Sequence, residues 1–204
     1  MAPYNGGLNC LTRDGKLLAT YTTRNSSLSN NVVLSLAERE GQIWIGTDGG
    51  GINILDPETG QFSLLEHIPG RDNYSLPANS ILCLYNDRNN NMWAGSIRNG
   101  LISIREVSMK TYKDVLPGND RGLSNSTVLS LFQESENRIW IGTDGGGINS
   151  FNPFTEKFAH YPSTWEDKVA SICPFTPGKL LISLFSQGVF IFNPATGENI
   201  PSPL

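Results

Sequence analysis

The string IWIGTDGGGIN occurs twice in this chain, at residues 43–53 and 139–149, identical at all eleven positions. Only 9% of the residues are aromatic, so composition bias does not explain two identical strings that contain tryptophan. A glycine-rich phosphate loop would lead into a helix whose N-terminus faces the phosphate. Here DGGG precedes alternating apolar residues, and the string lacks the lysine of a P-loop. The sequence therefore predicts a repeated structural unit.

Further copies of this unit fill most of the chain. NMWAGSIRNGLIS lies between the two identical strings, and KLLISLFSQGVFIFNP follows them with leucine in place of tryptophan. A partial copy opens the chain with GGLNCLTRDGKL. The same glycine of each copy recurs after 44, 49, 47 and 41 residues, at Gly7, Gly51, Gly100, Gly147 and Gly188. A period in the forties is typical of β-propeller blades.

Each copy reads as four short strands joined by turns, which predicts an all-β fold of four-stranded antiparallel blades. In the first full copy these strands are VLSL, QIWIGT, GINIL and a strand that begins near QFSLL. We expect one propeller segment over residues 1–204, with a partial blade at about 4–26, three complete blades at about 27–74, 75–121 and 122–165, and a second partial blade at about 166–204.

The tryptophans and glycines of the repeat are predicted to be structural. One tryptophan falls at the same phase of the second strand in three copies, so these rings are expected to pack between neighbouring blades, with sugar stacking as the alternative. The glycines after DGG are expected to form a hairpin turn with positive φ and close packing between blades. Trp165 is out of phase and is expected at the surface. The structural set is Trp44, Trp93, Trp140, Gly51, Gly100, Gly147 and Gly188.

Composition excludes several function classes. The net charge is −4 and only 17% of residues are charged, which argues against a nucleic-acid surface. No apolar run approaches the ~20 residues of a membrane span, and the N-terminus lacks the pattern of a signal peptide. The cysteines Cys10, Cys83 and Cys173 have no metal-like spacing and are expected to be buried apolar residues. No metal or cofactor is predicted.

The candidate ligand site lies at one end of the blades. In a four-stranded antiparallel blade, the turn between the second and third strands shares its end with the connection to the next blade. Functional residues concentrate on loops over rigid scaffolds, although a polar residue in such a turn can also serve the turn itself. The candidate binding residues are Asp48, Arg98, Asn99, Asp144 and Gln187, with Asn31, Asn79 and Asn125 near the start of the first strands.

Signs of catalysis are weak. His67 and His160 sit at different phases of the repeat, so they do not mark a repeated site. There is no nucleophile elbow and no Walker motif. The leading hypothesis is therefore a non-catalytic recognition module, and the alternatives are a protein-interaction scaffold or a propeller lyase.

The copies SNNVVLSLAEREGQIWIGTDGGGINILDPETGQF and SNSTVLSLFQESENRIWIGTDGGGINSFNPFTEKF resemble two-component regulator propeller repeats. In that family the pattern is Leu-Ser, a hydrophobic-Trp-hydrophobic-Gly-Thr strand, a Gly-Gly turn and an Asp-Pro-x-Thr-Gly turn. With the degenerate copies, the resemblance covers almost the whole chain. It implies part of a larger propeller of the seven-bladed type.

The resemblance also implies a function. Family members often form the periplasmic sensor of an inner-membrane hybrid two-component protein, and they signal to a cytoplasmic histidine kinase through a phosphorelay. Their ligands are often oligosaccharides, so an oligosaccharide is the expected ligand here. An incomplete ring of blades leaves faces and strand edges unburied, which predicts self-association or pairing with further blades.

Overall fold

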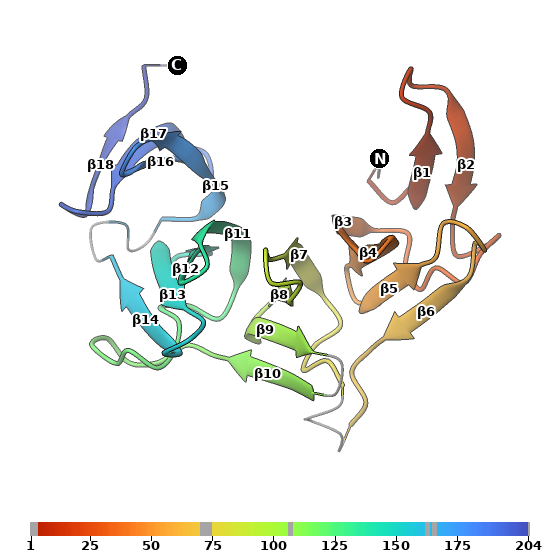
Figure 1. Ribbon diagram of the computed structural model, residues 1–204, viewed down its shortest axis with the longest axis horizontal. Coiled ribbons are helices and arrows are strands. Elements are labelled where there is room, and N and C mark those ends of the chain that lie inside the picture. The colour runs from red at the N-terminus through yellow and green to blue at the C-terminus, as the bar shows by residue number, and fades with distance from the viewer. Residues whose placement is uncertain (1–3, 70–74, 106–107, 162–163, 165–166, 204) are drawn as a thin grey trace. The chain divides into compact units, whose positions relative to one another are not determined.

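The computed structural model of the chain describes residues 4–69, 75–105, 108–161, 164 and 167–203. The regular structure of these residues consists of β-strands, arranged as four four-stranded antiparallel sheets and one two-stranded hairpin (Figure 1). The prediction of an all-β fold of four-stranded blades is confirmed. None of these residues belongs to a helix long and apolar enough to cross a membrane.

The sheets follow one another along the chain, and strands that are consecutive in sequence pair within each sheet. The hairpin and first sheet comprise β1 (Leu8–Leu11), β2 (Leu17–Tyr21), β3 (Val33–Arg39), β4 (Gln42–Thr47), β5 (Ile52–Leu55) and β6 (Phe62–Leu65). The second sheet comprises β7 (Ile81–Asn86), β8 (Met92–Ser96), β9 (Gly100–Arg105) and β10 (Ser108–Tyr112). The third sheet comprises β11 (Val128–Ser135), β12 (Arg138–Thr143), β13 (Ile148–Asn152) and β14 (Lys157–His160). The fourth sheet comprises β15 (Val169–Thr176), β16 (Lys179–Leu184), β17 (Gly188–Asn193) and β18 (Glu198–Pro201).

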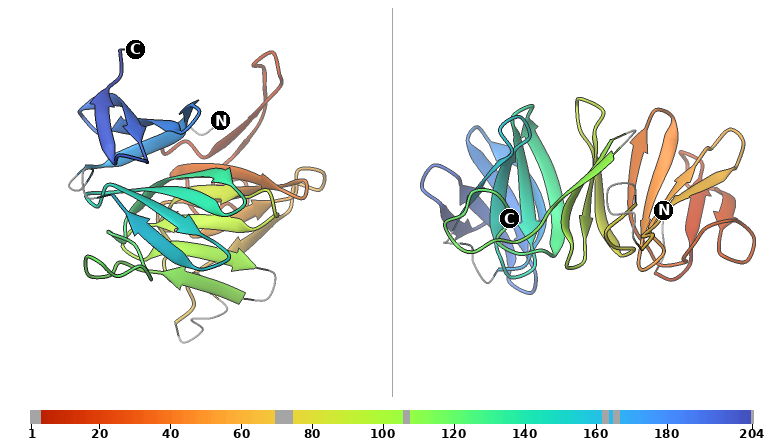
Figure 2. Two further views of the ribbon diagram at one scale, coloured as in Figure 1. Left: turned by 60° about the vertical axis from the view of Figure 1, so that its left-hand side comes forward. Right: turned by 90° about the horizontal axis from the view of Figure 1, so that it is seen from below.

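The chain divides into two compact units. The first unit contains residues 1–86, 90–94 and 103–110, and the second contains residues 87–89, 95–102 and 111–204. The hairpin β1–β2 and the sheet β3–β6 therefore belong to the first unit, and the sheets β11–β14 and β15–β18 belong to the second. Figure 2 shows the strands of β11–β14, in teal and cyan, side by side in chain order.

The last sheet is more complete than the sequence predicts. Four strands are present where a partial blade is expected, because Glu198–Pro201 pairs antiparallel with β17. The strand has only four residues and ends at Pro201, with no clear alternation of apolar residues. It forms because the turn after Asn193 returns the chain along β17, where the backbone of Asn199 lies opposite Phe192.

Trp140 joins two neighbouring sheets of the second unit. Its ring is fully buried and belongs to a cluster with Val169, Ile172 and other apolar residues of β15–β18. The ring centroid lies 6.1 Å from that of Phe192, in an edge-to-face arrangement. Edge-to-face pairs and large buried area make such a ring a strong packing anchor. Trp44 and Trp93 are also buried, with 6% and 2% exposed.

The neighbours of the tryptophan on the same strand point to the opposite face, as the two-residue period of a strand requires. In the first unit Ile45 is fully buried and packs with Leu55 against Leu8 of the hairpin β1–β2. Leu28, just before β3, joins the same cluster. The second strand of a blade therefore contacts the preceding sheet through isoleucine and the following sheet through tryptophan.

The glycine of the IWIGT strand lets adjacent sheets come close. A Cβ atom at Gly142 would collide with Ser130 Oγ and with the backbone carbonyl of Val169 in the following sheet. Gly46 faces β7 in the same way, because a Cβ there would meet the carbonyl of Ile81. Any larger residue at these positions would force the sheets apart.

The glycines after DGG have positive φ, but their close contact lies elsewhere than predicted. A Cβ at Gly51 or Gly100 would collide with the carbonyl of the last residue of the fourth strand of the same sheet, not with a neighbouring blade. A Cβ at Gly147 would meet Thr164, and one at Gly188 would meet nothing within 4 Å.

The backbone of these glycines links successive sheets. In four copies the glycine N–H donates a hydrogen bond to a carbonyl just before the first strand of the next sheet. The pairs are Gly7 to Asn31 at 2.9 Å, Gly51 to Asn79 at 2.8 Å, Gly100 to Ser126 at 2.7 Å and Gly147 to Asp167 at 3.3 Å. The repeat therefore encodes a connection between blades as well as the blade itself.

Two cysteines depart from the prediction of burial. Cys10 and Cys173 are exposed and Cys83 is half-buried, all as free thiols. Cys173 lies opposite Leu181 in β15–β16, the register that Phe132 and Trp140 occupy in the preceding sheet. That face packs on a following sheet in β11–β14, whereas Cys173 and Ile200 on the same face of β15–β18 are exposed.

Gly147→Ala is expected to destabilise the chain more than Gly178→Ala. Both glycines have positive φ, at +68° and +76°, so both changes carry the left-handed penalty of about 1–2 kcal/mol. Only Gly147 also lacks space for a Cβ, which adds about 1–3 kcal/mol of overpacking. Urea denaturation of both variants measures the difference, and equal losses of stability would contradict the contact assigned to Gly147.

Candidate functional site

Asp48 follows β4 and binds the segment that leads into β7. Its backbone N–H donates to the carbonyl of Val32 at 3.0 Å, which fixes the turn. Its carboxylate accepts a hydrogen bond from Ser80 Oγ at 2.9 Å, and Ser80 immediately precedes β7. The side chain of Asp48 therefore ties the first sheet to the second while remaining exposed.

Asp144 has the same position in the other identical copy. Its N–H donates to the carbonyl of Thr127 at 3.0 Å. Its carboxylate forms an ion pair with Lys168 at 2.9 Å, and Lys168 immediately precedes β15. The side chains are 37% and 52% exposed respectively, so the pair contributes at most about 1 kcal/mol to stability.

Gln187 meets the same segment from the next turn. Its Nε2 donates to Asp167 Oδ1 at 3.1 Å. The carbonyl of Asp167 in turn accepts the N–H groups of Gly145 and Gly147, at 3.1 and 3.3 Å. The structure thus brings Asp144 and Gln187 together around residues 167–168. We call Asp144, Asp167, Lys168 and Gln187 the turn cluster.

Arg98 is connected to the turn cluster indirectly, by two hydrogen bonds that Thr127 accepts. Its N–H lies 3.4 Å from Thr127 Oγ1, and the carbonyl of Thr127 accepts the N–H of Asp144. Arg98 has φ of +63° at the turn position that glycine fills in the identical copies. Its side chain is exposed, and its guanidinium has no hydrogen-bond partner among the described residues. Asn99 is half-buried, with Nδ2 3.4 Å from the carbonyl of Ile97.

The three candidate asparagines hold backbone N–H groups. Asn31 Oδ1 accepts the N–H of Thr23 at 2.9 Å, and Asn79 Oδ1 accepts that of His67 at 2.7 Å. Asn125 instead caps its own turn, by accepting the N–H of Thr127 at 2.7 Å. In the third sheet Ser126 occupies the repeat position of Asn31 and Asn79. Its Oγ accepts the N–H of Asp114 at 3.0 Å. Ligand binding by these asparagines stays a prediction, because what the structure displays is their capping role.

The sequence analysis did not predict a polar pair, close to these turns, that contains a buried asparagine. Asn149 is fully buried, accepts the N–H of Ser124 at 2.9 Å and donates to Ser124 Oγ at 2.7 Å. Ser124 Oγ donates onward to the carbonyl of Gly146 at 2.6 Å. Ser29, Asn53 and Gly50 repeat the same arrangement in the first sheet. The pair secures the DGGG turn to the segment before the first strand.

The second sheet replaces both members of this pair at once. Pro77 stands at the serine position and Ile102 at the asparagine position, and Ile102 is fully buried. Proline has no N–H to satisfy and isoleucine offers no acceptor, so the two changes compensate. This coupled replacement between copies is the signal in the sequence that could have revealed the pair.

Asn149→Ala is expected to lower the free energy of unfolding by about 1–3 kcal/mol, because it leaves the N–H of the half-buried Ser124 without its acceptor. The matched control is Asn89→Ala, an exposed asparagine, with an expected change within about 0.5 kcal/mol. The pair Ser124→Pro with Asn149→Ile, which copies the second sheet, is expected to cost less than Asn149→Ile alone. Urea denaturation compares them, and additive losses would contradict the coupling.

The two histidines bind backbone carbonyls of connecting segments. His67 Nδ1 lies 2.8 Å from the carbonyl of Leu76, and His160 Nε2 lies 2.8 Å from that of Gly122. The His67 ring therefore contacts the segment that leads to the next sheet, whereas the His160 ring contacts the segment that enters its own sheet. Among the described residues, no three His, Cys, Asp or Glu side chains gather as a metal site would require. Trp165, expected at the surface, lies outside the described residues.

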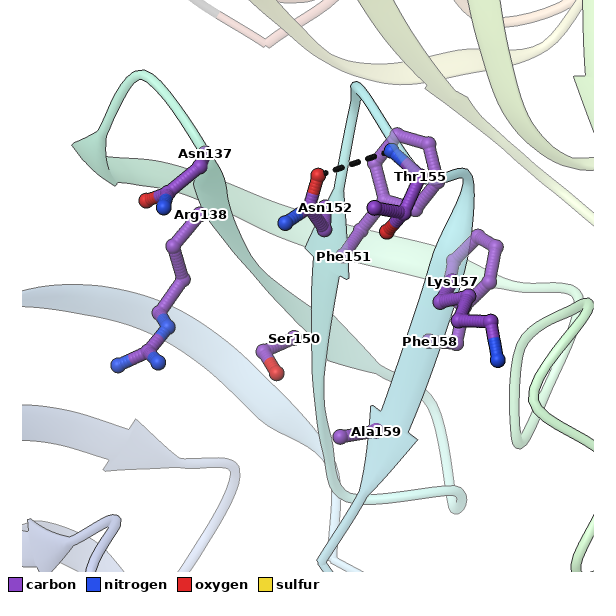
Figure 3. A pocket seen from close by; sticks show the side chains of 9 residues that line it. All are labelled: Asn137, Arg138, Ser150, Phe151, Asn152, Thr155, Lys157, Phe158 and Ala159. Atoms are coloured by element: carbon purple, nitrogen blue, oxygen red, sulfur yellow. Dashed lines mark hydrogen bonds between the residues drawn. The ribbon is translucent and has the colours of Figure 1, made fainter.

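A groove of about 270 Å³ lies on the sheet β11–β14, at the end opposite to the turn cluster (Figure 3). It is bounded by the β11–β12 turn and by the β13–β14 turn. Lys157 at its rim pairs with Asp120 at 2.8 Å, and the hydrogen bond and charge of Lys157 hold the pKa of Asp120 below its ordinary value. The lining residues are Asn137, Arg138, Ser150, Phe151, Asn152, Thr155, Lys157, Phe158 and Ala159.

A family model described as two component regulator propeller matches the chain three times. The matched segments are residues 27–49, 75–98 and 122–145, and each ends in the turn after the second strand of a sheet. The chain carries two-component regulator propeller repeats. The resemblance deduced from the two long copies is thereby confirmed, including its degenerate copy at residues 75–98.

Solved structures share the fold of these repeats. The extracellular domain of the putative hybrid two component system BT3049 from B. thetaiotaomicron matches with a TM-score of 0.73 and 21% identity, over 94% of this chain and 26% of that one. That of BT4673 from the same organism matches with a TM-score of 0.66 and 19% identity, over 82% and 21%. Virginiamycin B lyase from Staphylococcus aureus matches with 0.61 and 16%, over 88% and 58%.

The chain spans about a quarter of the length of the two extracellular domains. At these identities the likeness concerns the fold alone. No curated protein matches the chain.

Proposed function

We propose that this chain is a non-catalytic recognition segment in the extracytoplasmic, periplasmic sensor of an inner-membrane two-component signalling protein, and that its ligand is an oligosaccharide. The three propeller repeats support the signalling context. The observation that carries the ligand proposal is the turn cluster, where a carboxylate, an ammonium group and an amide meet at the surface of a rigid β scaffold.

Sugar hydroxyls both donate and accept hydrogen bonds, so a sugar site needs both kinds of partner. Asp144 and Asp167 supply acceptors, Lys168 supplies donors, and the amide of Gln187 supplies both. The groups are held by turns whose backbone is fixed to the following sheet. A preorganised set of this kind loses little conformational freedom when a ligand binds.

The same contacts argue against catalysis at these turns. The acidic and basic side chains of the turn cluster already pair with one another, and both histidine rings already bind loop carbonyls. A propeller lyase would need a histidine and acidic groups that converge on one bound substrate. The similarity to virginiamycin B lyase concerns the fold and supplies no such residues.

We expect Asp144→Asn and Gln187→Ala each to weaken oligosaccharide binding by up to about tenfold, because the first replaces a charged acceptor with a weaker neutral one and the second removes a neutral hydrogen bond worth about 1 kcal/mol. A glycan array identifies a binding oligosaccharide, and calorimetry then compares the variants. Glu58→Gln in the exposed turn after β5 is the control, with expected affinity equal to that of the parent chain. Failure of the parent chain to bind any glycan would overturn the proposal in favour of a protein-interaction scaffold.

A row of apolar residues on the last sheet favours that second function, or pairing with further blades. Cys173, Leu181, Ile191 and Ile200 lie opposite one another across β15 to β18, on one face of the sheet. Ile200 is 55% exposed. The equivalent row in β11–β14 contains Trp140, which is buried against a following sheet. Exposed apolar surface of this kind marks an interaction site.

We therefore predict that the isolated chain self-associates through this row. Sedimentation is expected to detect a dimer or larger species whose fraction rises with concentration, and Ile200→Lys is expected to shift it toward monomer. Leu116→Lys, at a residue that is 83% exposed in the connection between β10 and β11, is the control. A parent chain that is monomeric at all concentrations would contradict the prediction.

A further inference from the structure

The charged and polar side chains at the centre of the groove, Arg138, Ser150, Asn152 and Lys157, lie on one face of the sheet β11–β14. Asn152 lies opposite Lys157, and Ser150 lies opposite Ala159, in the pairing of β13 with β14. Directly opposed residues share a face, as do residues two apart on a strand. Arg138 closes one side of the groove from the start of β12, and Ser150 and Asn152 lie between it and Lys157 (Figure 3).

The first sheet provides an internal reference for this face. It has the same IWIGTDGGGIN string and the same register, with Ile54 opposite Trp44 where Ser150 lies opposite Trp140. At the four groove positions the first sheet has Gln42, Ile54, Asp56 and Gln61, where the third has Arg138, Ser150, Asn152 and Lys157. One apolar residue has become a hydroxyl, one carboxylate has become an amide, and two neutral amides have become cations.

These replacements fill the groove with hydrogen-bond donors. Asn152 Oδ1 accepts the N–H groups of Phe154 and Thr155, at 2.9 and 3.1 Å, so its Nδ2 is left to donate. The Ser150 hydroxyl has no partner among the described residues. Arg138 uses Nη1 for Glu134, at 3.3 Å, and its other nitrogens stay available. No lining residue carries a carboxylate.

Acidic residues lie near the groove but do not line it: Glu136 and Glu156 are in the two turns that bound it, and Glu134 and Asp120 pair with its cations. Glu134 Oε2 also accepts the N–H of Trp140, at 3.2 Å, so Arg138 shares that oxygen with the indole. Asp120 meets Lys157 from outside the groove, and the ammonium group and the carboxylate are 65% and 47% exposed. Exposed pairs of this kind are weak, because water screens the two charges. A ligand anion can therefore compete for the guanidinium.

We propose that this groove binds an oxyanion, which is a carboxylate or sulfate group that is either free or carried on a sugar. The planar guanidinium of Arg138 presents donors in the geometry that such a group accepts. Asn152 and Ser150 donate from the floor, and Lys157 adds positive potential at the rim. The site is independent of the turn cluster and lies at the other end of the same sheet.

The experiment follows backbone amide shifts of the full 204-residue chain by NMR at constant ionic strength. The probes are inorganic sulfate, glucuronate and neutral glucose. We expect saturable shifts confined to residues 137–138 and 150–159 with sulfate or glucuronate, and none with glucose. A sulfate response identifies a free anion as sufficient, whereas a response to glucuronate alone identifies a carboxylate on a sugar ring.

Asn152→Asp is the decisive variant. Aspartate caps the same turn in the first sheet, where Asp56 accepts the N–H groups of Glu58 and Thr59, so the fold is expected to persist. The new carboxylate removes a donor and repels an anion, and we expect affinity to fall about tenfold or more. Asp56→Asn in the first sheet is the matched control, with expected affinity equal to that of the parent chain.

The reverse transfer tests sufficiency. The combined changes Gln42→Arg, Ile54→Ser, Asp56→Asn and Gln61→Lys are expected to create a second anion response, at the corresponding amides of β3–β6. The proposal is overturned if neither sulfate nor glucuronate gives a saturable response, or if Asn152→Asp responds like the parent chain. Oligosaccharide binding at the turn cluster is unaffected by either result.

Discussion

The close approach of one four-stranded sheet to the next is the constraint on which the rest of this structure depends. A blade buries neither of its faces alone, so each needs a partner surface on both sides. On the face of the second strand that contacts the following sheet, tryptophan fills the space between the sheets. Two residues later on the same face, glycine has no side chain, so that the backbone of the next sheet can lie close. Trp140 with Gly142 illustrates the arrangement. Both residues of this pair are therefore explained by packing.

The same constraint explains why so many polar residues at the turns have partners. Each sheet is connected to the next by a glycine N–H, and the adjoining side chains satisfy the remaining backbone groups. Buried polar groups must be hydrogen-bonded, and here one residue often serves two strands. Asn79 accepts one hydrogen bond through its carbonyl and another through its side chain. Under the proposed function, ligand contacts therefore come from side chains that this framework leaves exposed.

Sequence alone was sufficient for the fold because the period, the tryptophan phase and the turn residues all agree. QIWIGT was predicted as a strand and forms β4 with the same limits. The fourth strand of the last sheet was missed because hydrogen bonds of its backbone define it, and ENIP has no apolar alternation. Exposure of Cys173 was missed because it depends on whether another sheet follows, which a local pattern does not report.

The candidate site was predictable in position more than in detail. Chain order places the turns at one end of the blades, so Asp144 and Gln187 could be selected, whereas Lys168 could not because its pairing depends on side-chain conformation. Arg98 adopts a left-handed backbone that glycine would accept without strain, at a cost of about 1 kcal/mol. Asn5 and Ser186 occupy the same turn position in two other copies, with φ of +54° and +62°, so this turn accepts residues other than glycine and presents an exposed side chain that differs from copy to copy.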